Sequence, residues 1–293
     1  MKSKFTSVVI IVSLLLLFTG IGICQDKVSA TDWVDKVGHG NINWSTGYVE
    51  AVGIGALPDN LIRKINARPI ALRAAQKDAL RNLLEITKGV QFDSASAIKD
   101  FTVANDVVDK QVDGLVKGAE VVDYQYMPDG RAEVRLRIPL YGNLAQIIMP
   151  LAMAKPHAVP APTESITVPA VKASESPSAL VVYTGMVVDT RGIQAHPAIS
   201  LRIFDEDGKE VYGLANIDLE YAEKQGISGY TRDLTAAQIN QRVGANPLTV
   251  KAVRTSGPGK SDIIISNADA QKVRSSAESA SFLKQCKVII VLD

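Results

Sequence analysis

Three polar side chains of different chemistry follow one apolar segment closely. Asp189, Arg191 and His196 come directly after Leu180 to Val188, which is typical of a buried strand. Strand ends often carry binding or catalytic side chains. One hypothesis is therefore a ligand-binding or catalytic loop from Asp189 to His196. The sequence favours another, in which Asp189 pairs with Arg191 and fixes the loop, since no Gly-x-Ser-x-Gly nucleophile elbow accompanies it.

A second segment resembles part of a phosphate-binding loop. Gly257-Pro258-Gly259-Lys260-Ser261 has the Gly-Lys-Ser ending, but Arg254 stands where a further glycine is needed. Such a loop also precedes a helix, whose N-terminus helps to hold the phosphate. Asp262 to Ile265 is instead typical of a strand, so the sequence predicts a hairpin turn.

Metal ligands are sparse in this chain. Its three histidines, His39, His157 and His196, have no ligand spacing, and of the two cysteines only Cys286 lies outside the N-terminal segment. Cys286 precedes an apolar run and is expected to be a small buried side chain at the start of a strand.

The carboxylates of Asp205-Glu206-Asp207-Gly208 could offer oxygens to calcium. Asp-Gly at the tip of a hairpin is ordinarily turn chemistry, and the sequence favours a turn. We therefore predict no catalytic, cofactor-binding or metal-binding residues and no cofactor. The formal net charge of +1 gives no electrostatic footprint for nucleic acid.

The elements that would position these residues fall into two modules. Ile42 to Gly53 is typical of a strand that closes into the loop Gly53-Ile54-Gly55. A long helix is expected from about Asn66 to Lys88, with small apolar residues at fourfold spacing. Such a face lets a helix lie very close to a sheet. The residues on it are Ala71, Ala75, Ala79 and Leu83.

A hairpin is expected to complete the sheet of the first module. Its strands are Ala119 to Tyr126 and Ala132 to Tyr141, and its turn carries Gly130 at positive φ. Charged and apolar residues alternate from Glu133 to Ile138, which indicates a sheet with one face exposed to solvent. A further helix is expected from Asn105 to Val116.

The second module has its own alternation of strands and helices. A helix is expected at Ala236 to Val243, and strands are expected at Leu248 to Val253 and Asp262 to Ser266. A helix from Asn267 and a last strand, Cys286 to Leu292, follow. This final strand–helix–strand order is consistent with a parallel crossover unit.

A proline-rich stretch separates the modules. Five prolines lie between residues 151 and 178 among Ala, Val, Ser and Thr, a composition that favours extended, solvated backbone. The predicted organisation is a signal segment (1–30), a first α+β domain (31–150), a Pro/Ala-rich linker (151–178) and a second α/β domain (179–293). The predicted fold class is α+β, with a mixed or antiparallel sheet packed by helices in each domain.

The N-terminus predicts export. Lys2 and Lys4 precede the apolar run Val8 to Phe18, as in a bacterial signal peptide. Cleavage after Val28-Ser29-Ala30 would satisfy the small-residue requirement of signal peptidase, and cuts after Gly22 or Cys24 are alternatives. An uncleaved anchor is an alternative. Lipidation at Cys24 is another, against which stands the bulky Ile23.

The first module resembles a known family in its ordered motifs. These are Gly53-Ile54-Gly55, the alanine-rich helix Ala71 to Leu84, the Val90 strand, the step Val116-Lys117-Gly118-Ala119 and the Asp129-Gly130 hairpin. Over residues 32–150 the chain resembles the domain shared by LPP-twenty-type outer-membrane lipoproteins and the N-terminal part of FlgT-type flagellar proteins. The resemblance implies a cell-envelope location, binding to other envelope components and no catalytic residues.

Together these features predict an exported, two-domain, non-catalytic protein of the bacterial cell envelope. Its expected location is the periplasm or the periplasmic face of the outer membrane. Its expected partners are envelope proteins, including outer-membrane or flagellar ring components, with membrane association through the N-terminus. The alternative is a periplasmic ligand-binding protein or enzyme that uses the loop from Asp189 to His196.

Overall fold

The computed structural model describes residues 29–57, 67–154, 182–276 and 279–293. The described residues from Thr31 to Asp293 form one compact unit. The predicted signal segment up to Val28 and linker residues 155–178 lie outside the described residues, so both stay predictions. Within the described ranges, no helix combines the length and apolar character that crossing a bilayer requires.

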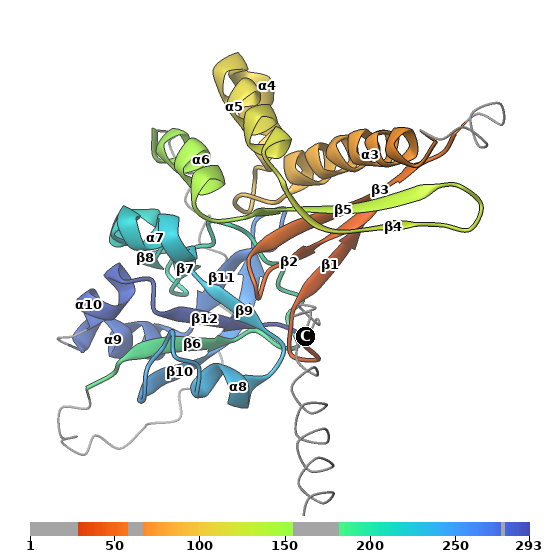
Figure 1. The fold of residues 1–293 in the computed structure, drawn as a ribbon. Coiled ribbons are helices and arrows are strands. Elements are labelled where there is room, and N and C mark those ends of the chain that lie inside the picture. The colour runs from red at the N-terminus through yellow and green to blue at the C-terminus, as the bar shows by residue number, and fades with distance from the viewer. Residues whose placement is uncertain (1–28, 58–66, 155–181, 277–278) are drawn as a thin grey trace, which may run out of the picture. The chain divides into compact units, whose positions relative to one another are not determined.

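Five antiparallel strands form the first sheet (Figure 1). In spatial order they are β1 (Val34–Val37), β2 (Gly40–Asn43), β3 (Tyr48–Gly55), β5 (Ala132–Pro139) and β4 (Glu120–Tyr126). β4 and β5 are the predicted hairpin, with Gly130 at φ 86°. The strand expected from Ile42 to Gly53 is in fact two strands, β2 and β3, which pair with each other across a turn.

Helix α3 (Ala67–Gly89) lies along β3 and β5 on one face of this sheet (Figure 1). The predicted alanine stripe is confirmed, because Ala71, Ala75 and Ala79 are fully buried. The loop expected at Gly53-Ile54-Gly55 is wrong, since these residues belong to β3 and pair with β5. Their glycines serve close approach instead: a Cβ at Gly53 would lie 2.1 Å from Ala79 N.

Three further helices complete the first half of the chain. They are α4 (Ile98–Ala104), α5 (Asp106–Lys117) and α6 (Asn143–Ala154). Asn105 caps α5 by accepting a hydrogen bond from Val107 N. Helix α6 contains Pro150 and continues four residues into the stretch predicted as linker.

The second sheet is mixed and has the order β8-β7-β11-β10-β6-β12-β9. Its strands are β6 (Gly185–Asp189), β7 (Ile203–Phe204), β8 (Glu210–Tyr212), β9 (Gly229–Thr231), β10 (Pro247–Ser256), β11 (Asp262–Ile265) and β12 (Val288–Val291). Its helices are η2 (Leu214–Asn216), α7 (Leu219–Gln225), α8 (Leu234–Gln238), α9 (Asn267–Ser275) and α10 (Ser279–Lys284).

The parallel crossover expected at the C-terminus is wrong. β11 pairs antiparallel with β10, and β10 runs parallel to β6, which runs parallel to β12. β11 and β12 therefore point in opposite directions and are separated by two strands. One antiparallel and one mixed sheet, each packed by helices, confirm the predicted α+β class.

Both sheets contribute to one continuous hydrophobic core. It contains Val49 and Leu136 from the first sheet together with Met186 and Ile290 from the second, all nearly inaccessible to solvent. Close-packed interiors of this kind transmit strain between their parts. The two halves of the chain are thus held by burial and not by their covalent connection alone.

Candidate interaction surface

The polar side chains at the end of β6 and in the loop after it pair with one another and stabilise the loop. Arg191 donates two hydrogen bonds to Asp189, from Nε to Oδ1 at 2.8 Å and from Nη2 to Oδ2 at 3.0 Å. Lys251 Nζ lies 3.3 Å from Asp189 Oδ2. The hydrogen bond from Arg191 is the main cause that lowers the pKa of Asp189 to about 2. Such a carboxylate stays ionised near neutral pH and is a poor proton acceptor.

His196 lies at the other end of this loop with an exposed side chain. Its backbone N–H donates to Lys260 O. Among the described residues, no hydrogen bond or ion pair joins the His196 side chain to Asp189 or Arg191. The pairing of Asp189 with Arg191 that the sequence favoured is confirmed.

In the acidic turn between β7 and β8, the contacts of Asp205 likewise stabilise the local structure. Asp205 Oδ1 accepts hydrogen bonds from the backbone N–H groups of Asp207 and Lys209, and Asp205 Oδ2 pairs with Arg274 Nη1 at 2.8 Å. Gly208 adopts φ 79°. The turn interpretation is confirmed. In the part of the chain that the structure describes, no three His, Cys, Asp or Glu side chains are arranged to hold a metal ion.

The segment Gly257 to Ser261 is the predicted hairpin turn, between β10 and β11. Gly257 and Gly259 of this turn contact Ser94, which lies in the first half of the chain. Gly259 N donates to Ser94 O at 2.7 Å, and a Cβ at Gly257 would lie 2.6 Å from Ser94 Oγ. A side chain at Gly257 would clash with the Ser94 side chain, whereas a Cβ at Gly259 would lie 3.0 Å from Ser94 O.

Further contacts join the two halves of the chain. Together with the contacts of Ser94, we call them the seam. Backbone N–H groups of Ile199 and Ser200 donate to the carbonyls of Gln91 and Phe92. Residues 199 and 200 thus bond to the first half and lie outside the second sheet, whose nearest strand, β7, begins at Ile203. Trp44 packs edge-on against Tyr230, with ring centroids 5.8 Å apart.

One exposed edge of the first sheet is capped by its own helix. β3 extends past β2, which leaves backbone groups of Val52 and Ile54 without a strand partner on that side. Asp78 Oδ2 accepts from Ile54 N at 3.0 Å, and Asn82 Nδ2 donates to Val52 O at 2.8 Å. Helix α3 therefore satisfies this edge, as sheet proteins commonly do to prevent unwanted strand pairing.

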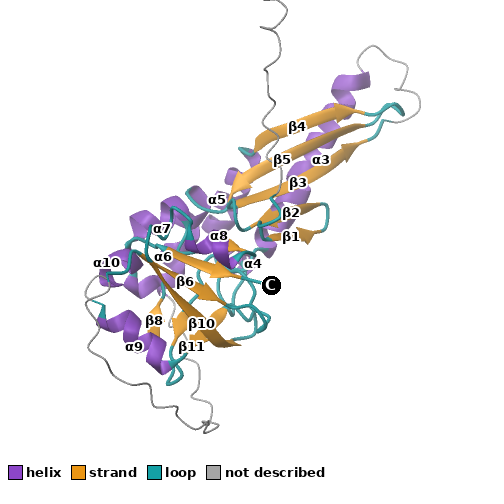
Figure 2. Ribbon diagram, turned by 90° about the horizontal axis from the view of Figure 1, so that it is seen from below, coloured by secondary structure: helices purple, strands orange, loops and turns teal. Residues whose placement is uncertain are grey.

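At the opposite edge of the sheet, no further strand of the described residues pairs with the outermost one. β4 is the terminal strand, and each of its seven residues is exposed. We call this strand the β4 edge. Figure 2 shows β4, β5 and β3 running together past β1 and β2, with β4 outermost. An exposed strand edge is a template for pairing with another extended segment.

The β4 edge carries large apolar side chains. Tyr124 is 55% exposed, and Val121 and Tyr126 are 47% and 40% exposed. These three share the α3-facing side of the sheet, because they pair with the buried Leu136, Val134 and Ala132 of β5. The apolar surface that α3 covers over β5 therefore continues onto β4, where Arg68 of α3 lies 5.6 Å from the centre of the Tyr126 ring and the Tyr124 side chain stays more than half exposed.

Sequence reasoning predicted the β4 strand but not the exposure of its apolar side chains. The alternation of Asp123 and Gln125 with Tyr124 and Tyr126 is a signal for a strand with one apolar face. It does not reveal that the side chains of this face stay exposed beside α3.

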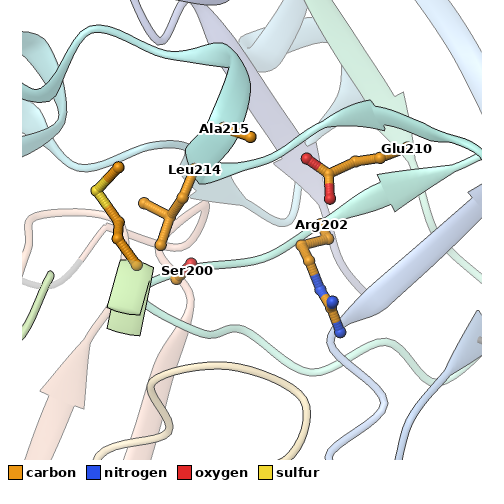
Figure 3. Close-up of a pocket in the computed structure, with 6 residues that line it drawn as sticks. Ser200, Arg202, Glu210, Leu214 and Ala215 are labelled. Atoms are coloured by element: carbon orange, nitrogen blue, oxygen red, sulfur yellow. The ribbon is translucent and has the colours of Figure 1, made fainter. Parts of the chain in front are cut away.

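A separate cavity of about 280 Å³ lies between the two halves of the chain. It is lined by Met153 of α6, Ser200, Arg202, Glu210 of β8, and Leu214 and Ala215 of η2. Figure 3 shows Glu210 and Arg202 on one side, with Leu214 and Ser200 opposite. Arg202 also pairs with the buried Asp262, with Nη2 2.7 Å from Oδ2.

Comparison with known proteins places a similarity on the second half only. Residues 185–293 match a family model described as Treponema pallidum Tp0624, second domain. The match begins at the first residue of β6, includes every strand of the second sheet and covers less than half of the chain. No curated protein matches the chain. The C-terminal half is thus similar to a treponemal domain family.

Proposed function

We propose that this is an exported, non-catalytic protein of the bacterial cell envelope that acts by binding other proteins. The β4 edge is the observation that carries the proposal. It is a terminal strand with exposed Val121, Tyr124 and Tyr126, and Asp123 Oδ1 accepts a hydrogen bond from Tyr124 N at 2.8 Å, whereas α3 caps the free edge of β3. Aromatic residues are enriched at protein interfaces, where they combine apolar area with a polar end.

Further support comes from the polar residues that the sequence singled out. Asp189 is held by Arg191 and Lys251, and Asp205 is held by its turn and by Arg274. No observation favours acid–base chemistry in the loop from Asp189 to His196. The resemblance of residues 32–150 to LPP-twenty-type and FlgT-type domains supports a role in outer-membrane or flagellar structure assembly.

Site-specific photocrosslinking in intact cells tests the proposal. A photoreactive phenylalanine analogue at Tyr124 is expected to capture envelope proteins. The same analogue at Arg81, an exposed position on α3, is the control. Recovery of only the uncrosslinked monomer from the Tyr124 position would contradict the proposal.

A variant pair tests whether the surface itself is required. Tyr124→Lys places a charge on the β4 edge, which should abolish co-purification with the crosslinked partners. Ile239→Lys makes the same change at a side chain that is 78% exposed at the end of α8. Its co-purification should equal that of the unchanged protein. Sequencing the mature N-terminus and fractionating envelopes test the predicted export.

A further inference from the structure

Helix α5 buries one side and exposes the other. Figure 1 shows it beside α4, at the periphery of the fold. Its inner side carries three buried valines, Val108, Val112 and Val116. On the outer side, Val107 is 62% exposed. The other exposed residues of the helix lie on this outer side too, and they are Asp106, Lys110, Gln111, Gly114 and Lys117.

The charges of α5 divide in the same way. Towards α3, Asp109 and Asp113 pair with Lys88, with Nζ–Oδ1 distances of 2.6 and 3.7 Å. On the outer side, the side chains of Asp106 and Lys117 form no hydrogen bond or ion pair among the described residues. These two lie about 20° apart around the helix axis and about 16 Å apart along it. One flank of α5 therefore carries a negative charge at its start and a positive charge at its end, and the chain itself pairs neither.

Gly114 adds a second feature to the outer side. Nothing lies within 4 Å of a Cβ built at this position, so packing within the chain does not require a glycine. Glycine inside a helix is less favourable than alanine, but it lets another backbone approach closely. The exposed Val107 lies two turns earlier on the same side of the helix. The outer side therefore offers one apolar projection and one gap.

We propose that α5 pairs antiparallel with α5 of a second copy of this chain, about a two-fold axis that passes beside Gln111. Such an axis brings the same flank of both helices together. Asp106 of each copy then lies opposite Lys117 of the other, and each Val107 packs at the gap beside Gly114 of the other copy. A parallel arrangement would bring ends of like charge together. The charges therefore select the antiparallel pair.

The contact between two such helices is small. Three turns of helix on each side bury less than the roughly 1,200 Å² at which standard protein complexes begin. Association is therefore expected to be weak and to depend on protein concentration. The surface is separate from the β4 edge and does not rest on the function proposed for that edge.

Sedimentation velocity measures the association. The described residues from Thr31 to Asp293 form one compact unit, so residues 31–293 are the test protein. All measurements use the Tyr124→Lys background, which removes association through the β4 edge. Dimers are expected to appear as the protein concentration rises from about 10 to about 500 µM, and about 0.5 M salt should reduce them.

Charge reversals test the pairing of Asp106 with Lys117. Asp106→Lys and Lys117→Asp should each weaken the dimer at least about tenfold, because each turns two attractive contacts into repulsive ones. The double variant should return to within about threefold of the original affinity, since opposite charges face each other again. Glu85→Lys, at an exposed position on α3, is the control and should change nothing. The reversals also oppose the helix dipole, so thermal unfolding at the lowest concentration checks that each variant folds.

Crosslinking locates the contact on the molecule. Residues 31–293 contain one cysteine, the buried Cys286. Gln111→Cys places a thiol beside the two-fold axis, and a short bis-maleimide should join two copies there. Val103→Cys is the control, because this side chain is 86% exposed but lies on α4, outside the helix pair. It should remain a monomer under the same conditions.

Four results would overturn the proposal. One is the absence of a dimer up to about 500 µM protein. Another is a single charge reversal that leaves the affinity unchanged. A third is a double variant that associates as weakly as the single ones. The last is crosslinking of Val103→Cys as efficient as that of Gln111→Cys.

Discussion

Ser94 Oγ donates a 2.6 Å hydrogen bond to Asp262 Oδ2, although 168 residues separate the two in the sequence. Both side chains are buried, and Asp262 also receives two hydrogen bonds from Arg202. The bond joins the loop after α3 to the first residue of β11. Contacts of this kind tie the two sheets into one folded unit.

Ser94→Ala should destabilise the protein by about 1–3 kcal/mol. The substitution leaves a buried carboxylate oxygen with one donor fewer, and charged acceptors are costly to leave unsatisfied. Urea denaturation measures the change. Ser275→Ala, at an exposed position on α9, is the control and should stay within about 0.5 kcal/mol of the unchanged protein. Equal stability of the two variants would show that the bond contributes nothing.

Cutting the chain between the halves should leave them associated. A protease site placed in residues 155–181 would be cleaved without loss of the shared core, to which both halves contribute. The nicked protein is expected to elute from a sizing column at the uncut position. Elution as two smaller species would show that the seam is too weak to hold the halves together.

Gly53→Ala should destabilise the protein by more than about 2 kcal/mol. The added Cβ would lie 2.1 Å from Ala79 N and 2.3 Å from Ala75 O, and a helix backbone cannot shift cheaply in a packed core. Gly114→Ala in α5 is the matched control, because nothing lies within 4 Å of its added Cβ. It should stabilise the protein by roughly 0.5–1 kcal/mol. Thermal unfolding compares them, and equal effects would contradict the close approach of α3.

Asp189 should make stability depend on pH in the acid range. Its pKa falls from 3.8 to about 2 on folding, so its contribution is present above about pH 4 and is lost as the pH falls towards 2. That contribution is about 2 kcal/mol. Asp189→Asn should therefore be less stable by about this amount at pH 7, with the difference shrinking below pH 3. A difference that is constant with pH in urea titrations would rule out the ion-pair origin.

The sequence predicted local features better than spatial neighbours. The alanine stripe of α3 and the β4–β5 hairpin follow from periodicity and turn chemistry, which act between residues close in the chain. The direction of β11 relative to β12 does not, because it depends on which strands lie between them. Likewise, Gly257 and Gly259 indicated a turn, but their contact with Ser94 required the packed structure.

At the candidate surface, too, the sequence indicated residue types but not which residues lie together in space. The polar residues near Asp189 attracted attention because their types are chemically active, yet their contacts are with each other. The β4 edge consists of residue types without special chemistry, and what distinguishes it is that its large apolar side chains are exposed on a terminal strand. Its exposure is set by where α3 ends its coverage of the sheet, a property that no short segment encodes.

The contacts of Ser200 and Tyr230 with the first half set a requirement for any other chain that contains the C-terminal half. The match to the treponemal family model begins at Gly185, so the segment that resembles that family is smaller than the unit that folds here. Any chain that carries the C-terminal half beside a different neighbour must cover Tyr230 and the backbone of Ile199 and Ser200 in another way.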